Sequence, residues 1–213
     1  MNKNSDRILS AFITFVHERL GLSPDQVSVV SLVVGVLAAF LVAGGHLEAG
    51  LIALALSQAI DGIDGGIARR YGLISDRGKT LDTVFDRVNE FVIFLALAFA
   101  GFVSYRMAAL AFVAILLVTA VEPLSKFDPG FKRFMIYFGY LATVIFHIRG
   151  FEIALHVVFW ANLIAFVVGT ILVDYRLQRR IDAQAIMRRE SERASGIAPL
   201  PEDPPSLLSR VFS

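Results

Sequence analysis

The stretch Asp61–Glu90, DGIDGGIARRYGLISDRGKTLDTVFDRVNE, places aspartates, arginines and glycines between two long apolar segments. The chain as a whole is strongly apolar, because 56% of its 213 residues are hydrophobic and 18% are charged. A soluble domain is usually about half apolar and about a quarter charged. The composition therefore indicates a membrane protein, and the polar stretch needs a role within one.

Six segments are predicted to span the membrane, since a spanning helix needs about 20 mostly apolar residues. The chain is therefore predicted to be all-α, a polytopic membrane protein with six transmembrane helices. The third predicted span carries half of the polar stretch and becomes apolar only from Phe91. The predicted spans are Pro24–Gly44, Leu47–Tyr71, Ser75–Val103, Tyr105–Val121, Phe131–Ile148 and Glu152–Val173.

The ends of the chain are predicted to lie outside the spans, which form a domain of residues 23–175. Residues 1–22 contain an apolar stripe over Asp6–Leu20, which predicts an amphipathic helix on the membrane surface. A charged helix is predicted within residues 176–194. The Pro- and Ser-rich residues 195–213 are predicted to be disordered.

The basic residues predict the orientation of the spans. In the six-span arrangement, 18 of the 20 Lys and Arg residues fall on the side that holds both termini, and Arg106 and Arg149 fall on the other. Both termini and the polar stretch are therefore predicted to be cytoplasmic. The net charge of +1 gives no reason to expect a nucleic-acid partner.

The four aspartates of the stretch are spaced to act in pairs. Asp61 and Asp64 are three residues apart and Asp82 and Asp86 are four apart, so each pair shares one face of its helix. The turn between the helices brings the two acidic faces together. Clustered carboxylates need compensation by positive charge, and Mg²⁺, Mn²⁺ or Ca²⁺ binds carboxylate oxygens. The pattern therefore predicts a metal site, with room for two ions.

Glycines accompany the aspartates on both helices. Gly62 and Gly66 are expected to let the helices approach closely. Gly65 and Gly78 leave space for a ligand's phosphates to reach the backbone, and Arg69 is expected to clamp a diphosphate. Each feature alone is common in helix packing and at salt-bridged helix ends. Their concentration in one stretch favours a site for a phosphorylated ligand.

The polar stretch follows one spacing pattern, Asp61-x2-Asp64-Gly65-x2-Ala68-Arg69-x8-Gly78-x3-Asp82-x3-Asp86. This pattern resembles the signature of the CDP-alcohol phosphotransferases, integral membrane enzymes of phospholipid synthesis, at all eight defining positions. The resemblance implies six spans preceded by a surface helix. The segment SPDQVS is similar to the family's Pro-Asn-x-x-Thr element, but Asp25 and Ser28 replace two of its residues, so no role is carried over to them.

The resemblance also implies roles for the motif residues. Two Mg²⁺ or Mn²⁺ ions would be bound by the four aspartates, Asp61, Asp64, Asp82 and Asp86. Asp86 would also act as the general base on the acceptor hydroxyl. The CDP moiety of CDP-diacylglycerol or another CDP-alcohol would contact Asp64, Gly65, Arg69 and Gly78. CMP would leave, and the protein would be a homodimer surrounded by membrane lipid.

Three basic residues outside the stretch are candidates for binding an acceptor alcohol. Lys126 lies between the fourth and fifth predicted spans, Arg133 lies at the start of the fifth, and Arg176 follows the sixth. They resemble the positions that hold the acceptor phosphate in family members that use inositol phosphate. The favoured acceptor is therefore a phosphorylated polyol, inositol phosphate or glycerol phosphate. Serine as the acceptor and a CDP-polyol as the donor remain open. The three basic residues could also flank the membrane and bind lipid headgroups.

Two other functions are compatible with a polytopic protein of this kind. An ion transporter would place ionisable residues near the bilayer midplane, whereas here they cluster at one end of the spans. A catalytically inactive scaffold of the same fold would be expected to have lost a metal ligand, and the sequence retains all four aspartates. The sequence therefore favours an enzyme.

Overall fold

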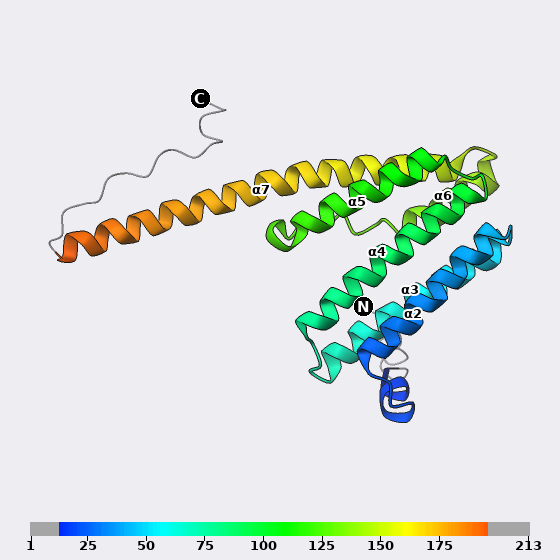
Figure 1. Cartoon of the computed structure of the whole chain (residues 1–213), viewed down its shortest axis with the longest axis horizontal. Coiled ribbons are helices and arrows are strands. Elements are labelled where there is room, and N and C mark those ends of the chain that lie inside the picture. The colour runs from blue at the N-terminus through cyan, green and yellow to red at the C-terminus, as the bar shows by residue number, and fades with distance from the viewer. Residues whose placement is uncertain (1–12, 196–213) are drawn as a thin grey trace.

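The computed structural model describes residues 13–195, and all of its regular elements are helices. A π-helical turn, η1 (Phe15–Arg19), precedes six α-helices that run back and forth through one bundle (Figure 1). The prediction of an all-α protein is confirmed. The α-helices are α2 (Pro24–Ala43), α3 (Leu47–Arg70), α4 (Asp76–Phe99), α5 (Tyr105–Ser125), α6 (Phe134–Phe146) and α7 (Gly150–Ser195).

Serine residues set the starts of three of these helices. Ser23 caps α2 by accepting a hydrogen bond from the Gln26 N–H at 3.3 Å, and the Gln26 side chain accepts one from the Ser23 N–H at 2.9 Å. Ser75 and Ser104 cap α4 and α5 by accepting from the N–H three residues further on. Such caps satisfy N–H groups that have no partner inside the helix. They explain why the helix starts follow closely from the sequence.

Four of the described helices are long and apolar enough to cross a membrane, namely α2, α3, α5 and the Gly150–Arg188 part of α7. Their outer faces expose large apolar side chains, and Phe40 and Ile52 are 72% and 71% exposed. Such surfaces suit a lipid environment. The charged first half of α4 and the 13-residue length of α6 keep these two helices out of this group. The structure thus supports four of the six predicted spans.

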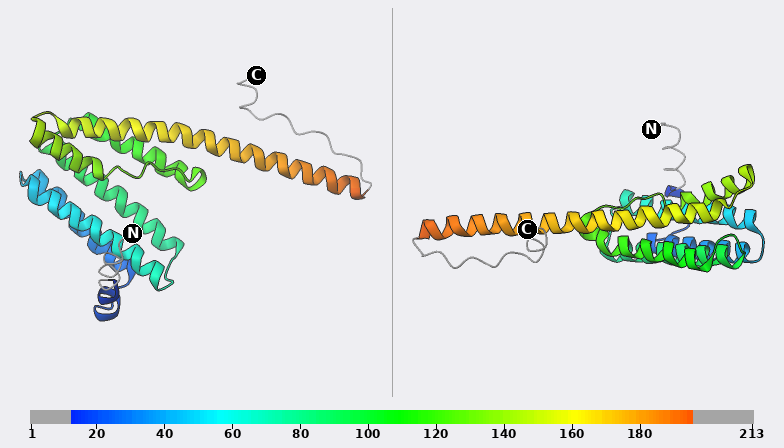
Figure 2. Two further views of the ribbon diagram at one scale, coloured as in Figure 1. Left: turned by 180° about the vertical axis from the view of Figure 1, so that it is seen from behind. Right: turned by 90° about the horizontal axis from the view of Figure 1, so that it is seen from above.

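The C-terminal part of the described chain forms one helix where two were predicted. α7 has 46 residues and contains both the sixth predicted span and the charged helix after it. The helix is continuous because no glycine or proline occurs between Thr170 and Ser195. Figure 2 shows that its second half projects well beyond the other helices. The predicted disordered tail lies, apart from Ser195, outside the described residues.

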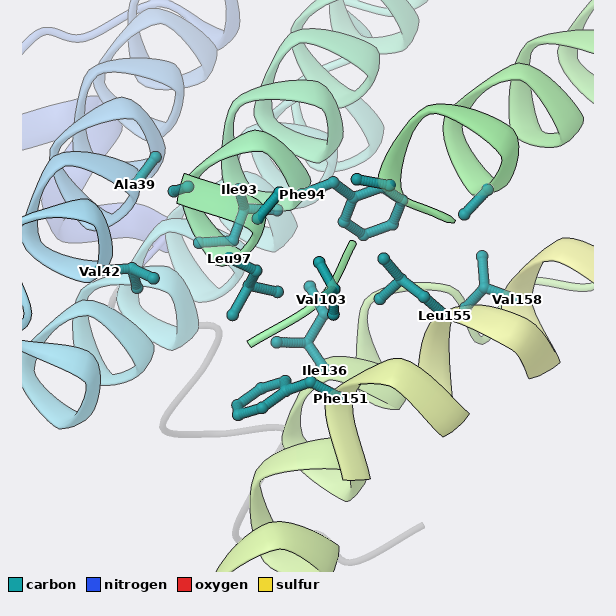
Figure 3. Packing of buried hydrophobic residues seen from close by; sticks show 14 of the residues in the cluster. Ala39, Val42, Ile93, Phe94, Leu97, Val103, Ile136, Phe151, Leu155 and Val158 are labelled. Carbon is teal, nitrogen blue, oxygen red and sulfur yellow. The ribbon is translucent and has the colours of Figure 1, made fainter. Parts of the chain in front are cut away.

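The apolar core fills the end of the bundle at which the helices converge. Phe94 and Leu97 of α4 meet Phe151 and Leu155 of α7 there, and all four are at most 1% exposed (Figure 3). α3 and α4 both pack along α2 and make at most marginal contact with each other. α5 and α6 pack along α7, and α4 also contacts α5. The polar ends of α3 and α4 therefore lie away from the core, at the other end of α2.

The described part of the N-terminal segment packs against α3. Residues 6–12 of the predicted surface helix lie outside the described residues, but Ile13 is buried in a cluster with Ile63 and Ile67 of α3. A Cβ built on Gly66 would lie 2.6 Å from Ile13 Cδ1, whereas one on Gly62 would meet no atom within 4 Å. Gly62 therefore has no close neighbour among the described residues and does not bring helices together there. Gly66 instead makes room for Ile13.

We predict that Gly66→Leu lowers the midpoint of thermal unfolding, because the new side chain would displace Ile13. Overpacking of this kind typically costs about 1–3 kcal/mol. Gly62→Leu is the matched control and should unfold near the wild-type temperature. Adding Ile13→Ala to Gly66→Leu should recover most of the loss. Equal unfolding temperatures for the two leucine variants would contradict the docking of the N-terminal segment.

Candidate functional site

Three aspartates converge where α3 ends and α4 begins. Carboxylate oxygens of Asp61, Asp64 and Asp82 lie within 4.8 Å of one another, close enough to share a cation. Asp61 and Asp64 belong to the last three turns of α3, and Asp82 belongs to the second turn of α4. Gly72, with a φ of 66°, lies in the short connection that reverses the chain between the helices. The structure thus brings together three of the four predicted metal ligands.

The fourth predicted ligand, Asp86, is bound to an arginine from another part of the chain. Arg133 immediately precedes α6, and its Nη1 donates to Asp61 Oδ2 at 2.9 Å. Its Nη2 forms an ion pair with Asp86 Oδ1. The guanidinium group therefore links α3 to α4 and offsets the charge of two carboxylates. Arg133 was predicted to bind an acceptor phosphate, and in the structure it lies among the aspartates.

Asp64 is held by a residue to which the sequence alone assigned no role. Its side chain is buried, and Ser28 Oγ of α2 donates to its Oδ2. The N–H of Gly65 donates to Oδ1. These contacts fix the orientation of the carboxylate toward the other aspartates. The signal for Ser28 was its place in the SPDQVS segment, at the position where the family element has threonine.

The glycines predicted to line a nucleotide site keep the rim of the aspartate cluster open. A Cβ on Gly65 would lie 3.2 Å from Nη1 of Arg69, which is exposed. A Cβ on Gly78 would lie 3.1 Å from Ser75 Oγ and 3.6 Å from Asp25 Oδ1. Larger residues at these positions would therefore crowd polar groups beside the aspartates.

The other two residues predicted to bind an acceptor phosphate have different surroundings from Arg133. Arg176 donates to the carbonyls of Leu124 at 3.1 Å and Ser125 at 3.0 Å, and so caps the C-terminal end of α5. Lys126 is exposed just after that end, in the left-handed conformation with a φ of 54°. Arg176 therefore has a structural role, since it ties α7 to the end of α5.

A cavity of about 290 Å³ adjoins Arg133 and Asp86. It lies between α3, α4 and the connection from α5 to α6. Two ion pairs line it, Arg87 with Glu90 at 2.8 Å and Lys132 with Asp128 at 2.9 Å. Sequence reasoning missed this cavity, because its walls come from three separate parts of the chain. The lining residues are Gln58, Asp86, Arg87, Glu90, Asp128, Gly130, Lys132, Arg133 and Phe134.

Residues 22–172 match the sequence profile of the CDP-alcohol phosphatidyltransferases. The match covers well over half of the chain. The chain belongs to this family. The resemblance inferred from the aspartate motif is confirmed. Family membership and the long apolar helices together identify an integral membrane protein.

Similar sequences include family members with assigned names. The archaetidylinositol phosphate synthase of Pyrococcus horikoshii is 29% identical over 101 residues, covering 47% of this chain and 53% of that protein. The enzyme of the same name from Methanothermobacter thermautotrophicus is 30% identical over 115 residues, covering 54% and 59%. The bifunctional IPC transferase and DIPP synthase of Rubrobacter xylanophilus is 39% identical over 90 residues, covering 42% and 20%. The matches thus span a fifth to somewhat over half of these relatives.

Solved structures of a phosphatidylinositol phosphate synthase share the fold. The phosphatidylinositol phosphate synthase of Mycobacterium tuberculosis in complex with manganese and citrate superposes with a TM-score of 0.63 at 18% identity, covering 74% of this chain and 85% of that one. The same synthase with CDP-DAG bound gives a TM-score of 0.61 at 20% identity, covering 79% and 92%. At these identities the likeness establishes the shared fold.

We predict that Arg176→Gln lowers the unfolding temperature, because two carbonyls at the end of α5 lose their partner. Each lost hydrogen bond should cost about 1 kcal/mol. Lys126→Gln is the matched control and should leave the unfolding temperature unchanged. Unchanged stability of Arg176→Gln, with a raised KM for a phosphorylated acceptor, would instead favour the phosphate-binding role predicted from the sequence.

Proposed function

We propose that the protein is an enzyme that transfers the substituted phosphate group of a CDP-alcohol to an acceptor hydroxyl and releases CMP. The observation that carries this proposal is the convergence of Asp61, Asp64 and Asp82 on one point, within the motif of the family. CDP-diacylglycerol is the proposed donor, since CDP-DAG is bound in a solved relative of the same fold.

The aspartate cluster fits Mg²⁺ or Mn²⁺, which prefer carboxylate oxygens. We assign one ion to Asp61, Asp64 and Asp82, and Asp86 would complete a site for a second. Bound divalent ions would neutralise the donor diphosphate and stabilise the leaving CMP. The synthase of M. tuberculosis, solved with manganese, supports this choice of cofactor.

The protein residues then have separable tasks. The CDP moiety is assigned to Asp64 of the cluster and to Gly65, Arg69 and Gly78 beside it. Asp86 lines the cavity, and we assign to it the role of accepting the proton of the acceptor hydroxyl. The hydroxyl oxygen forms a bond to the phosphorus next to the donor alcohol, and the bond from that phosphorus to CMP breaks.

The cavity beside Asp86 is the proposed acceptor site. Its volume of about 290 Å³ suits a small polyol. Arg133 lies at the edge of the cavity and can bind a phosphate when its contact with Asp61 is broken. The favoured acceptors are inositol phosphate and glycerol phosphate, with serine as the alternative. Relatives named archaetidylinositol phosphate synthase support the inositol class.

The membrane setting is part of the same proposal. α2 to α7 would form six spans, with α4 and α6 crossing alongside the four strongly apolar helices. The basic side, with the aspartate cluster and both termini, would face the cytoplasm. A homodimer is proposed from the family resemblance.

The proposed reaction is tested by CMP release. We expect the protein in lipid nanodiscs with Mn²⁺ and CDP-diacylglycerol to release CMP with one acceptor among inositol phosphate, glycerol phosphate, serine and inositol. Asp86→Asn should reduce turnover by about 100-fold or more, as expected for loss of a general base, while the nucleotide still binds. CMP release that is unchanged in Asp86→Asn would contradict the assigned base, and no release with any pairing would contradict the activity.

We also predict that Arg133 competes with divalent cations for the aspartates. Removing it in Arg133→Ala should tighten Mn²⁺ binding by about tenfold, because a charge-assisted hydrogen bond no longer has to be broken. The same variant should raise the KM for a phosphorylated acceptor. Mn²⁺ binding can be followed by calorimetry, with Asp61→Ala as the control that loses it. Weaker Mn²⁺ binding in Arg133→Ala would contradict the competition.

A further inference from the structure

Glu90 is a buried acid that the proposed reaction does not use. It lies on α4 four residues after Asp86, hence on the same face of the helix, and is 4% exposed. A buried carboxylate is costly unless it is paired and hydrogen-bonded. Arg87 supplies the charge, with Nη1 2.8 Å from Glu90 Oε2. Neither of these two atoms, however, makes a hydrogen bond with good geometry to any of the described residues.

Unpaired polar atoms gather around this pair. Among the described residues, seven buried side-chain atoms lack a hydrogen-bonding partner, and five of them belong to Gln58, Arg87, Asn89 and Glu90. Gln58, Arg87 and Glu90 line the 290 Å³ cavity. Leaving such atoms unpaired is costly, so buried polar groups normally have partners. The unpaired atoms of Gln58, Arg87 and Glu90 thus lie at one cavity, where a ligand could complete their hydrogen bonds.

The unpaired atoms match the chemistry of an alcohol. Gln58 Nε2 and Arg87 Nε are donors, and Glu90 Oε2 is an acceptor. A hydroxyl group donates one hydrogen bond and accepts others, so it can join these atoms. Water can do the same, but a single water occupies only about 30 Å³. The cavity is therefore large enough for a small ligand.

The ion pairs of the cavity leave little net charge to attract an ion. Lys132 is paired with Asp128, Arg87 with Glu90, and Arg133 with Asp86. The interior of the cavity therefore favours neutral, hydrogen-bonding groups, and a phosphate would be held at its Arg133 edge. Four residues along α4 correspond to a rise of about 6 Å, so one polyol can reach Asp86 and Glu90 with two different hydroxyls.

We propose that Glu90, with Gln58 and Arg87, selects a polyhydroxylated acceptor by binding a hydroxyl other than the one that attacks. Glu90 Oε2 accepts a hydrogen bond from this hydroxyl, and the hydroxyl oxygen accepts from Gln58 Nε2 or Arg87 Nε. This assignment rests on the proposed function, since it concerns the acceptor of that reaction. It disfavours serine, which has a single hydroxyl.

The absence of cysteine from the sequence permits a direct test by thiol labelling. Phe134 lines the cavity and is 61% exposed, so Phe134→Cys should react with a water-soluble maleimide. Inositol phosphate, inositol and glycerol phosphate should slow this labelling, and serine should not. Tyr105→Cys, 57% exposed at the start of α5, is the control that no compound should protect.

Glu90→Gln in the Phe134→Cys background should raise the polyol concentration that gives half-maximal protection by about tenfold or more, as for a lost charge-assisted hydrogen bond. Glu90→Asp should restore part of the protection. Gln58→Leu gives a second test by removing a donor. Unchanged Mn²⁺ affinity and elution volume will show that the variants are folded. Any of three results would overturn the proposal. Serine could protect as well as the polyols, Glu90→Gln and Gln58→Leu could leave the protection by polyols unchanged, or no polyol could protect at all.

CMP release separates this inference from the proposed reaction. If turnover depends on Asp86 but the KM for the polyol is the same in Glu90→Gln, the reaction stands and the role of Glu90 is wrong. Protection by polyols without CMP release from any pairing would instead refute the reaction and leave the polyol site in place. A raised acceptor KM with an unchanged donor KM in Glu90→Gln is the result expected.

Discussion

Repulsion among the carboxylates at the end of α3 and the start of α4 is the constraint on which the rest of the site depends. Two unit charges 4 Å apart interact with about 4 kcal/mol at the effective dielectric near a protein surface. Arg133 offsets part of this repulsion by contacting Asp61 and Asp86. Because Arg133 belongs to the α5–α6 connection, the same contacts fix that connection beside α3 and α4. The apolar core holds the bundle at one end, and charge holds it at the other.

Much of the site followed from spacing within single helices. A separation of three or four residues places two aspartates on one helix face, and a short turn between helices brings the two faces together. Serine caps at the helix starts depend on neighbouring residues in the same local way, as Ser23, Ser75 and Ser104 show. Geometry that repeats within one element, or that is set by neighbouring residues, can therefore be read from the sequence.

Contacts between distant segments could not be predicted in this way. Arg133 was assigned to a phosphate, but a long side chain binds whichever anion its backbone position lets it reach, and here those are the aspartates. Gly66 had the spacing of a helix-packing residue, yet the neighbour that fills its space is Ile13. The cavity next to Asp86 was missed for the same reason. A sequence motif predicts which residues share one helix face, but it does not predict which side chains from other segments lie opposite that face.

α7 combines two roles in a single rod. Its first half packs with α5 and α6, Arg176 fastens it to the end of α5, and the helix then continues to Ser195. The 19 residues beyond Arg176 correspond to about 28 Å of helix. A rod of this length acts as a spacer, since it holds its own end at Ser195 at a set distance from the contact that Arg176 makes with α5.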